Sequence, residues 1–174
     1  MRTVICAISI ALLLSSCAKN EPIPEPTVGE LDHVIDGNTL AVLMPAGVIE
    51  PVRLIGVHIS DEEASRRAAI WLGGVYDKGF PLLLTFDSIT RDKDGRLLAY
   101  VFAGKGTEGV SPEEVEQKNA KSRSMHAVML EGRVYGFVNA SLIKGGRAQP
   151  AQESRNRKYA DLFRELHEVS IDRR

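Results

Sequence analysis

Two arginines and two short polar segments hold the residue types in this chain that could do chemistry. Arg53 lies in the stretch VRLIGV, and Arg96 lies in DGRLLAY. A guanidinium donates hydrogen bonds in a fixed fork, which suits a phosphate group. The polar segments are Asp36-Gly37-Asn38 and His58-Ile59-Ser60-Asp61, which offer carboxylate, amide and imidazole groups. These types support phosphate binding, and carboxylates add possible ligands for a hard cation.

The same residues also have structural interpretations. Arg53 would form an ion pair on a strand, and Arg96 would flank a turn. Asp36 belongs to a run of turn-forming residues. Asp61 falls in the first turn of a predicted helix, where the helix dipole favours an acid. The residue types by themselves leave both interpretations open.

Strand patterns separated by turn signals occupy the first half of the chain. Apolar stretches predict strands over 31–44, 48–57, 80–90 and 96–103. The last two are separated by a segment ending in Asp94-Gly95, a hairpin-turn signal.

Four helices are predicted between and after these strands. A capping box headed by Ser60 begins the first, which we expect to end at Gly73-Gly74. A second, polar helix begins at Ser111, and a third follows Asn139. Apolar residues at helical spacing over 159–169 predict the last helix. Short strands with helices collecting late indicate an α+β domain built on a small barrel.

The N-terminus has the layout of a secretory leader. Arg2 precedes an apolar run that is too short to span a bilayer, and Leu14-Ser15-Ser16-Cys17 resembles the bacterial lipoprotein box. We therefore expect residues 1–16 to be a signal peptide, and 17–30 to be a lipidated Cys17 followed by a Pro-rich tether. An ordinary signal peptide is the alternative. Lipidation would place the protein in the bacterial cell envelope, on the periplasmic side or at the outer membrane.

Cysteine content and charge limit what kind of protein the mature chain can be. Removal of residues 1–16 takes away Cys6 and Arg2, which leaves 158 residues and no pair of cysteines for a disulfide. That length suits one domain. The mature chain has 21 Lys and Arg against 23 Asp and Glu, a net charge of −2. Nucleic-acid-binding proteins usually present a basic face, so this balance gives no support for tight binding to DNA or RNA.

Four stretches occur in an order and spacing that resemble the thermonuclease, or staphylococcal-nuclease-like, family. They are VIDGNTL, VRLIGVHISDEE, RDKDGRLLAYVF and VNASLIKGGRA, and the resemblance covers about residues 31–168. It implies an α+β fold over 31–170, with an OB-type five-stranded β-barrel and about three helices. Residues 104–132 would be a helical insertion before the penultimate helix. Enzymes of the family are calcium-dependent phosphodiesterases that cut DNA and RNA.

The resemblance also assigns roles to individual residues. Arg53 and Arg96 would hold the phosphate, and Asp61 stands where the family has its catalytic Glu. Asn38 and His58 stand at the places of two ligand aspartates. Ile59 replaces a Thr that contributes only its backbone carbonyl.

These replacements change the chemistry of the expected metal site. Asn38 and His58 lower the formal charge of the two ligand positions from −2 to zero, and Ca²⁺ affinity depends on ligand charge. Asp61 is one methylene shorter than Glu, and a displacement of about 1 Å can cost on the order of 100-fold in rate. A site rebuilt for a transition metal would use His58 and Asp61, with Asp36 or His33.

Three functional hypotheses follow. The first is a thermonuclease-like lipoprotein with a degenerate metal site, not an efficient nuclease, acting as a membrane-tethered binding or scaffold module. A protein partner would dock on the 104–132 insertion, and nucleic acid would bind only weakly. The second is an active metal-dependent phosphodiesterase with altered metal use. The third is an OB-type barrel that binds an oligosaccharide or a peptide.

Overall fold

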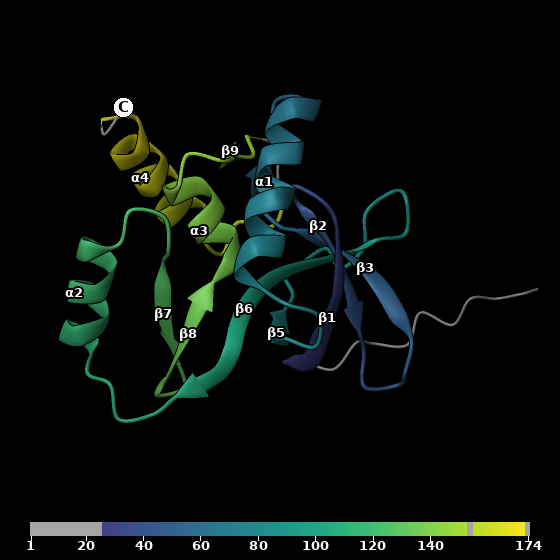
Figure 1. Cartoon of the computed structure of the whole chain (residues 1–174), viewed down its shortest axis with the longest axis horizontal. Helices are drawn as coiled ribbons and strands as arrows, with labels where there is room; N and C mark the ends of the chain where they lie inside the picture. Colours follow the sequence, from purple (N-terminus) through teal and green to yellow (C-terminus); the bar gives the residue numbers. More distant parts are fainter. Residues whose placement is uncertain (1–25, 153–154, 173–174) are drawn as a thin grey trace, which may run out of the picture.

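The strands of the first half of the chain close into a barrel. In the computed structural model, which describes residues 26–152 and 155–172, five strands form a closed mixed sheet with four helices around it (Figure 1). The expected α+β class with a five-stranded barrel of OB type is confirmed. The predicted signal peptide and Cys17 lie outside the described residues.

Two antiparallel units make up the barrel. The first is a meander of β1 (Thr27–Asp36), β2 (Thr39–Leu43) and β3 (Ile49–Leu54). The second is a pair formed by β5 (Pro81–Thr85) and β6 (Leu97–Thr107). Antiparallel pairing of β1 with β5 joins the units, and parallel pairing of β3 with β6 closes the barrel.

Three helices pack on the barrel, and a two-stranded ribbon lies beside them. The helices are α1 (Glu62–Val75), α3 (Val138–Lys144) and α4 (Ala160–Ile171). The ribbon pairs β4 (Val57–His58) with β9 (Gln149–Pro150).

The ends of α1 differ from the sequence prediction. The helix continues through Gly73 and Gly74 to Val75, because neither glycine adopts the positive φ of a helix-ending glycine and the Tyr76 N–H still bonds the Leu72 carbonyl oxygen. Its N-cap is Asp61, not Ser60, because the Asp61 carboxylate accepts the hydrogen bond of the Ala64 N–H.

The predicted insertion contains more than a helix. It holds α2 (Pro112–Lys121), which begins with the predicted capping box at Ser111. It also contributes β7 (Ala127–Leu130), which pairs with β8 (Arg133–Phe137), and β8 in turn pairs with β6. The insertion therefore extends the sheet outward, and Figure 1 shows α2 and β7 on the side of the molecule away from β3.

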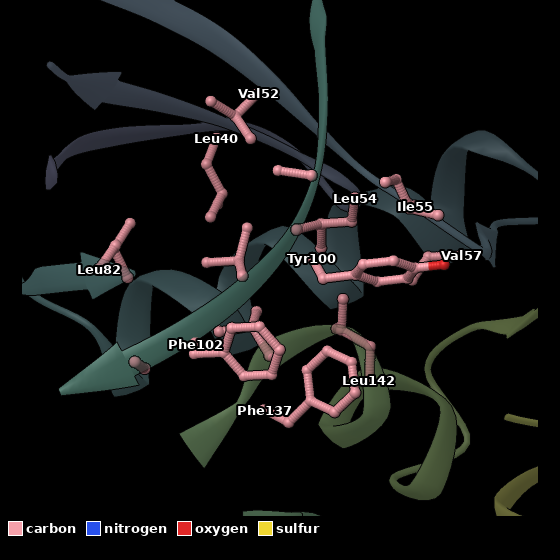
Figure 2. Close-up of a cluster of buried hydrophobic side chains, with 14 of the residues drawn as sticks. Leu40, Val52, Leu54, Ile55, Val57, Leu82, Tyr100, Phe102, Phe137 and Leu142 are labelled. Atoms are coloured by element: carbon pink, nitrogen blue, oxygen red, sulfur yellow. The ribbon is translucent and has the colours of Figure 1, made fainter. Parts of the chain in front are cut away.

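The core fills the barrel and continues under the helices. Figure 2 shows Leu40, Val52 and Leu82 from the barrel strands together with Phe102 and Phe137. The rings of Phe102 and Phe137 stack with centroids 4.6 Å apart. These aromatic contacts join the barrel to the start of α3, so the helical half and the barrel share one core.

Several strand boundaries also differ from the prediction. β1 begins at Thr27, so the last four residues of the expected tether belong to the barrel. The strand predicted over 80–90 ends at Thr85, because the Asp87 carboxylate accepts the Ser88 N–H and begins a turn. Within the described residues, no helix is long and apolar enough to cross a membrane.

Candidate functional site

The turn between β1 and β2 carries the first polar segment and is docked against α1. The Asp36 carboxylate accepts the Asn38 N–H at 2.8 Å, and the Gly37 N–H donates to Ser65 Oγ of α1 at 3.1 Å. A Cβ added at Gly37 would lie 2.6 Å from Ile59 Cδ1 and 2.7 Å from the Ser65 carbonyl oxygen. Glycine is therefore required at position 37 by the close approach of the helix.

Asn38 is built into the fold through both ends of its side-chain amide. The residue is only 6% exposed. Its Nδ2 donates to the Val57 carbonyl oxygen at 3.2 Å, and its Oδ1 accepts from Thr39 Oγ1 at 3.4 Å. A carboxylate cannot donate to a carbonyl oxygen, so an Asp at this position would lose the bond to Val57. The replacement expected to weaken a metal site is thus also a structural feature of this barrel.

His58 and Ile59 leave the β4 strand in different directions. His58 is exposed, pairs with Gln149 across the β4–β9 ribbon, and borders a small cavity that also contains Ser60. Ile59 is half-buried and packs over Gly37. His58 and Asn38, the two positions aligned with ligand aspartates, therefore occupy different environments.

The Asp61 carboxylate is occupied as a helix cap. Its Oδ1 accepts the Ala64 N–H at 2.7 Å, and its Oδ2 accepts from Ser60 Oγ at 2.7 Å. These two hydrogen bonds, the backbone one first, lower the pKa of Asp61 below its ordinary value. A lowered pKa makes a carboxylate a weaker base, which is the opposite of what proton abstraction from water needs.

The two arginines have different surroundings. Arg96 donates through Nε to Asp92 at 2.7 Å and through a terminal nitrogen to Asp94 at 2.9 Å. Arg53 is half-buried on β3, opposite Thr39 on β2 and Leu98 on β6. Within the described part of the chain, the Arg53 side chain makes no hydrogen bond or ion pair, although its backbone is paired in the sheet. Arg96 is held by its own loop, whereas the Arg53 guanidinium has no partner among the described residues.

The loop that holds Arg96 is a compact polar unit. The Asp92 carboxylate also accepts the backbone N–H groups of Asp94 and Arg96 at 3.0 Å each. Partial burial by itself would raise the pKa of Asp92, but hydrogen bonds from the Arg96 side chain and from these two N–H groups lower it overall. Asp92 and Asp94 therefore occupy part of the Arg96 guanidinium and offset the positive charge that would attract a phosphate.

The donor set does not fit a calcium ion. Asp36 and Asp61 border one open concavity of about 800 Å³ together with Glu62, Glu63 and Arg66, but neither Asn38 nor His58 lines it. His33, the other histidine considered as a ligand, is exposed and contacts Asp32 at 2.8 Å. Among residues 26–152 and 155–172, no three His, Cys, Asp or Glu side chains are grouped to hold a metal ion. Calcium takes six to eight oxygen ligands in typical sites, and these residues do not converge to supply them.

The insertion is fixed to α3 by a buried lysine that the sequence analysis did not identify. Lys144 is 5% exposed, and its Nζ donates to the carbonyl oxygens of Asn119 at 2.6 Å and Met125 at 3.2 Å. Asn119 lies near the C-terminal end of α2, where the helix dipole favours a cation. The Asn119 side chain also bonds the N–H and carbonyl of Ala127 on β7. The insertion is therefore docked on the domain.

Asn139 is a second residue whose role the sequence did not reveal. It is completely buried, and its Oδ1 accepts the Val101 N–H at 2.9 Å. Its Nδ2 donates to the carbonyl oxygens of Ile55 at 2.9 Å and Ala99 at 3.3 Å. This side chain joins α3 to β6 and to the end of β3. The available signal was one polar residue inside the apolar stretch FVNASLI.

Comparison with known proteins adds no relative to these observations. No protein-family model matches the chain, and no curated protein matches it.

Proposed function

We propose that this protein is a thermonuclease-like lipoprotein with a degenerate metal site, which binds a ligand or partner at the membrane and is not an efficient nuclease. One observation carries the proposal: the polar groups aligned with the catalytic apparatus are engaged inside the fold. Asn38 bonds Val57, Asp61 caps α1, and Arg96 is held by two carboxylates. Catalysis would need these groups directed at a substrate.

An apolar hairpin supports the membrane-tethered part of the proposal. The β2–β3 hairpin carries Val48 in its loop and Ile49 at the start of β3, which are 54% and 50% exposed, opposite Leu43 at the end of β2. Leu43 pairs with Glu30 near the start of β1, so the hairpin extends from the barrel end at which the chain enters the domain. β1 begins at that end, and the proposed lipidated Cys17 precedes β1 in the sequence. Exposed apolar residues there suit contact with a lipid surface.

A metal-dependent phosphodiesterase remains the alternative, and Arg53 favours it. This half-buried arginine makes no ion pair among the described residues, and a guanidinium in that state suits a phosphate. The alternative and the proposal differ in one measurable property, which is cleavage.

The test is a cleavage assay on the purified mature chain. Single-stranded DNA and RNA are incubated with Ca²⁺, Mg²⁺, Mn²⁺ or Zn²⁺, or with EDTA, beside Arg53→Ala and Arg96→Ala variants that reveal contaminating nuclease. We expect no cutting above the level of the two variants in any metal. Metal-dependent cutting that either substitution abolishes would overturn the proposal and establish the phosphodiesterase.

A further inference from the structure

A second polar cavity lies between the first turns of α1 and the loop that joins α3 to β9. It measures about 310 Å³ and opens to solvent beside His58. Two arginines, Arg67 and Arg147, line it with His58, Ser60 and Gln149. The remaining lining residues are Ala64, Gly145, Gly146 and Ala148, so no carboxylate lines the cavity among residues 26–152 and 155–172. The described walls carry cationic and hydrogen-bond-donating groups, and the ion pair of Arg67 with Glu63 lies outside the lining.

Arg147 is the principal cation of this cavity. Its guanidinium carbon lies 4.5 Å from the centre of the Trp71 ring, and Nη1 makes a long contact of 3.4 Å to the Gly145 carbonyl oxygen. Within the described residues it has no carboxylate partner. Desolvation lowers the pKa of Arg147 from its ordinary value, although a guanidinium stays charged at neutral pH. Trp71 therefore holds a partly desolvated cation by stacking, and its polar edge remains available for an anion.

The loop before β9 is shaped to admit this side chain. A Cβ added at Gly145 would lie 1.9 Å from Arg147 Nη1, so any other residue at 145 would displace the guanidinium. Gly146 follows with φ of 65°, in the left-handed region that favours glycine. The two glycines keep the backbone close beneath the arginine.

Arg67 contributes a second cation from the opposite wall. It pairs with Glu63 one helical turn away, and both side chains are more than half exposed. An exposed pair of this kind contributes little free energy, so the Arg67 guanidinium can reorient toward a ligand. Because Glu63 neutralises part of the charge of Arg67, Arg147 remains the dominant attraction.

We propose that this cavity is a phosphate-binding site, formed by Arg147 and Arg67 with donors from Gln149 and His58. Its ligand class is a tetrahedral phosphate oxyanion, either a free phosphate or the phosphodiester of a nucleic-acid strand. Phosphate suits the site because its oxygens can accept from two guanidinium forks at once. The cavity contains none of the candidate catalytic residues Arg53, Arg96 and Asp61, and of the candidate metal ligands it contains only His58 among the described lining residues.

Trp71 gives a direct readout, since it is the only tryptophan in the chain. The mature protein is titrated with inorganic phosphate while Trp71 fluorescence is recorded, with sodium chloride at matched ionic strength as the reference. We expect a saturable change with phosphate and none with chloride. Arg67→Gln leaves the Arg147–Trp71 stack in place and should weaken binding about tenfold, the loss expected for a charge-assisted hydrogen bond.

Calorimetry completes the test, because Arg147→Gln alters the environment of Trp71 directly. Heat of phosphate binding should be lost in Arg147→Gln and retained in Arg133→Gln, whose side chain pairs with Glu108 on the far hairpin. A parallel titration with a short single-stranded oligonucleotide distinguishes the two possible phosphate ligands. Tighter binding than phosphate indicates a phosphodiester, and weaker binding indicates a free phosphate.

Two outcomes would overturn the site: no saturable signal with either ligand, or equal affinity in Arg67→Gln, Arg147→Gln and the parent protein. Neither readout depends on cleavage, so this result is independent of the proposed loss of nuclease activity.

Discussion

The Nε of Arg96 and the Oδ2 of Asp92 lie 2.7 Å apart, and a terminal nitrogen of the same guanidinium lies 2.9 Å from Asp94. Arg96, which the resemblance places at a phosphate, therefore stabilises its own loop instead. Arg53, expected beside it, has no such partner among the described residues. The two residues share a residue type and an expected role, but their surroundings distinguish them.

This difference predicts different stability effects for two matched substitutions. Arg96→Ala removes a partly buried ion-pair network and should lower the free energy of unfolding by about 0.5–1 kcal/mol. Arg53→Ala removes no described ion pair and should cost less. Urea unfolding at pH 7 measures both variants. A larger loss for Arg53→Ala would show that Arg96 is not the structural arginine of the pair.

Restoring the acidic residue at position 38 should harm the fold. Asn38→Asp replaces a donor to the Val57 carbonyl with a buried negative charge, which leaves that contact repulsive. We expect a loss of about 1–3 kcal/mol in the free energy of unfolding at neutral pH, the usual cost of an unsatisfied buried polar group. Because the added carboxylate is neutral when protonated, the deficit relative to the parent protein should shrink as the pH falls toward 4.

Urea unfolding at pH 7 and pH 4.5 checks this expectation, with Asn38→Ala as the uncharged control. If Asn38→Asp matched the stability of the parent protein at neutral pH, the amide would not be a structural requirement. A metal site rebuilt by that change alone would then become worth testing.

Lys144 should hold the insertion in place. Lys144→Met keeps most of the side-chain volume but leaves the carbonyl oxygens of Asn119 and Met125 without their donor. We expect a loss of about 1–3 kcal/mol, with faster amide hydrogen exchange in α2 and β7 than in the barrel strands. Lys118→Met is the control, because Lys118 is exposed on α2. Uniform acceleration throughout the domain would contradict a local docking role.

The sequence predicted those features of the fold that arise from local chemistry. The capping box at Ser111 and the apolar face around Phe163 depend on residues three or four apart, and both were found as expected. The start of α1 was placed one residue early, because Ser60 and Asp61 are both good caps and only the backbone geometry selects between them.

The long-range contacts were not accessible from one sequence. Asn139 bonds Ile55, which is 84 positions away, and Lys144 bonds Asn119, which is 25 positions away. Such pairs leave no periodic signal, and a polar residue in an apolar stretch does not reveal its partner. The candidate site was affected in the same way. The sequence supplied the residue types at Asn38 and Arg96, but their internal partners appear only in the fold.

His126 should make stability depend on pH above the range of the carboxylates. Burial, with the charge of Lys144 as a second cause, lowers the pKa of His126 from 6.5 to about 4. At His126, the unfolded state therefore binds a proton more readily than the folded state. The stabilisation that comes from keeping His126 neutral in the folded state is complete above pH 6.5 and is lost as the pH falls toward 4. At 1.36 kcal/mol for each pKa unit, the loss between pH 7.5 and pH 5 is at most about 2 kcal/mol.

Urea unfolding between pH 5 and pH 7.5 measures how steeply the free energy of unfolding changes with pH. His126→Gln should flatten this slope, whereas His33→Gln, at an exposed histidine on β1, should not. An unchanged slope in His126→Gln would assign the pH dependence to other groups.

The β2–β3 hairpin should contact the membrane if the lipid at Cys17 holds the domain there. Ile49 and Ile35 provide a matched pair, because they are 50% and 49% exposed and lie toward opposite ends of the β1–β2–β3 meander. Each is replaced by Cys and labelled with an environment-sensitive fluorophore. On the proposed maturation, Cys6 would be removed with the leader and Cys17 blocked by lipid. In phosphatidylcholine vesicles the fluorescence emission of the label at 49 should shift to shorter wavelength, and that of the label at 35 should not, because apolar residues on that hairpin alone would enter the lipid interface.

Two other outcomes would contradict this prediction. An emission shift at neither position would mean that the tether holds the hairpin clear of the bilayer. An emission shift at 49 in detergent-free solution without vesicles would indicate self-association through the same residues.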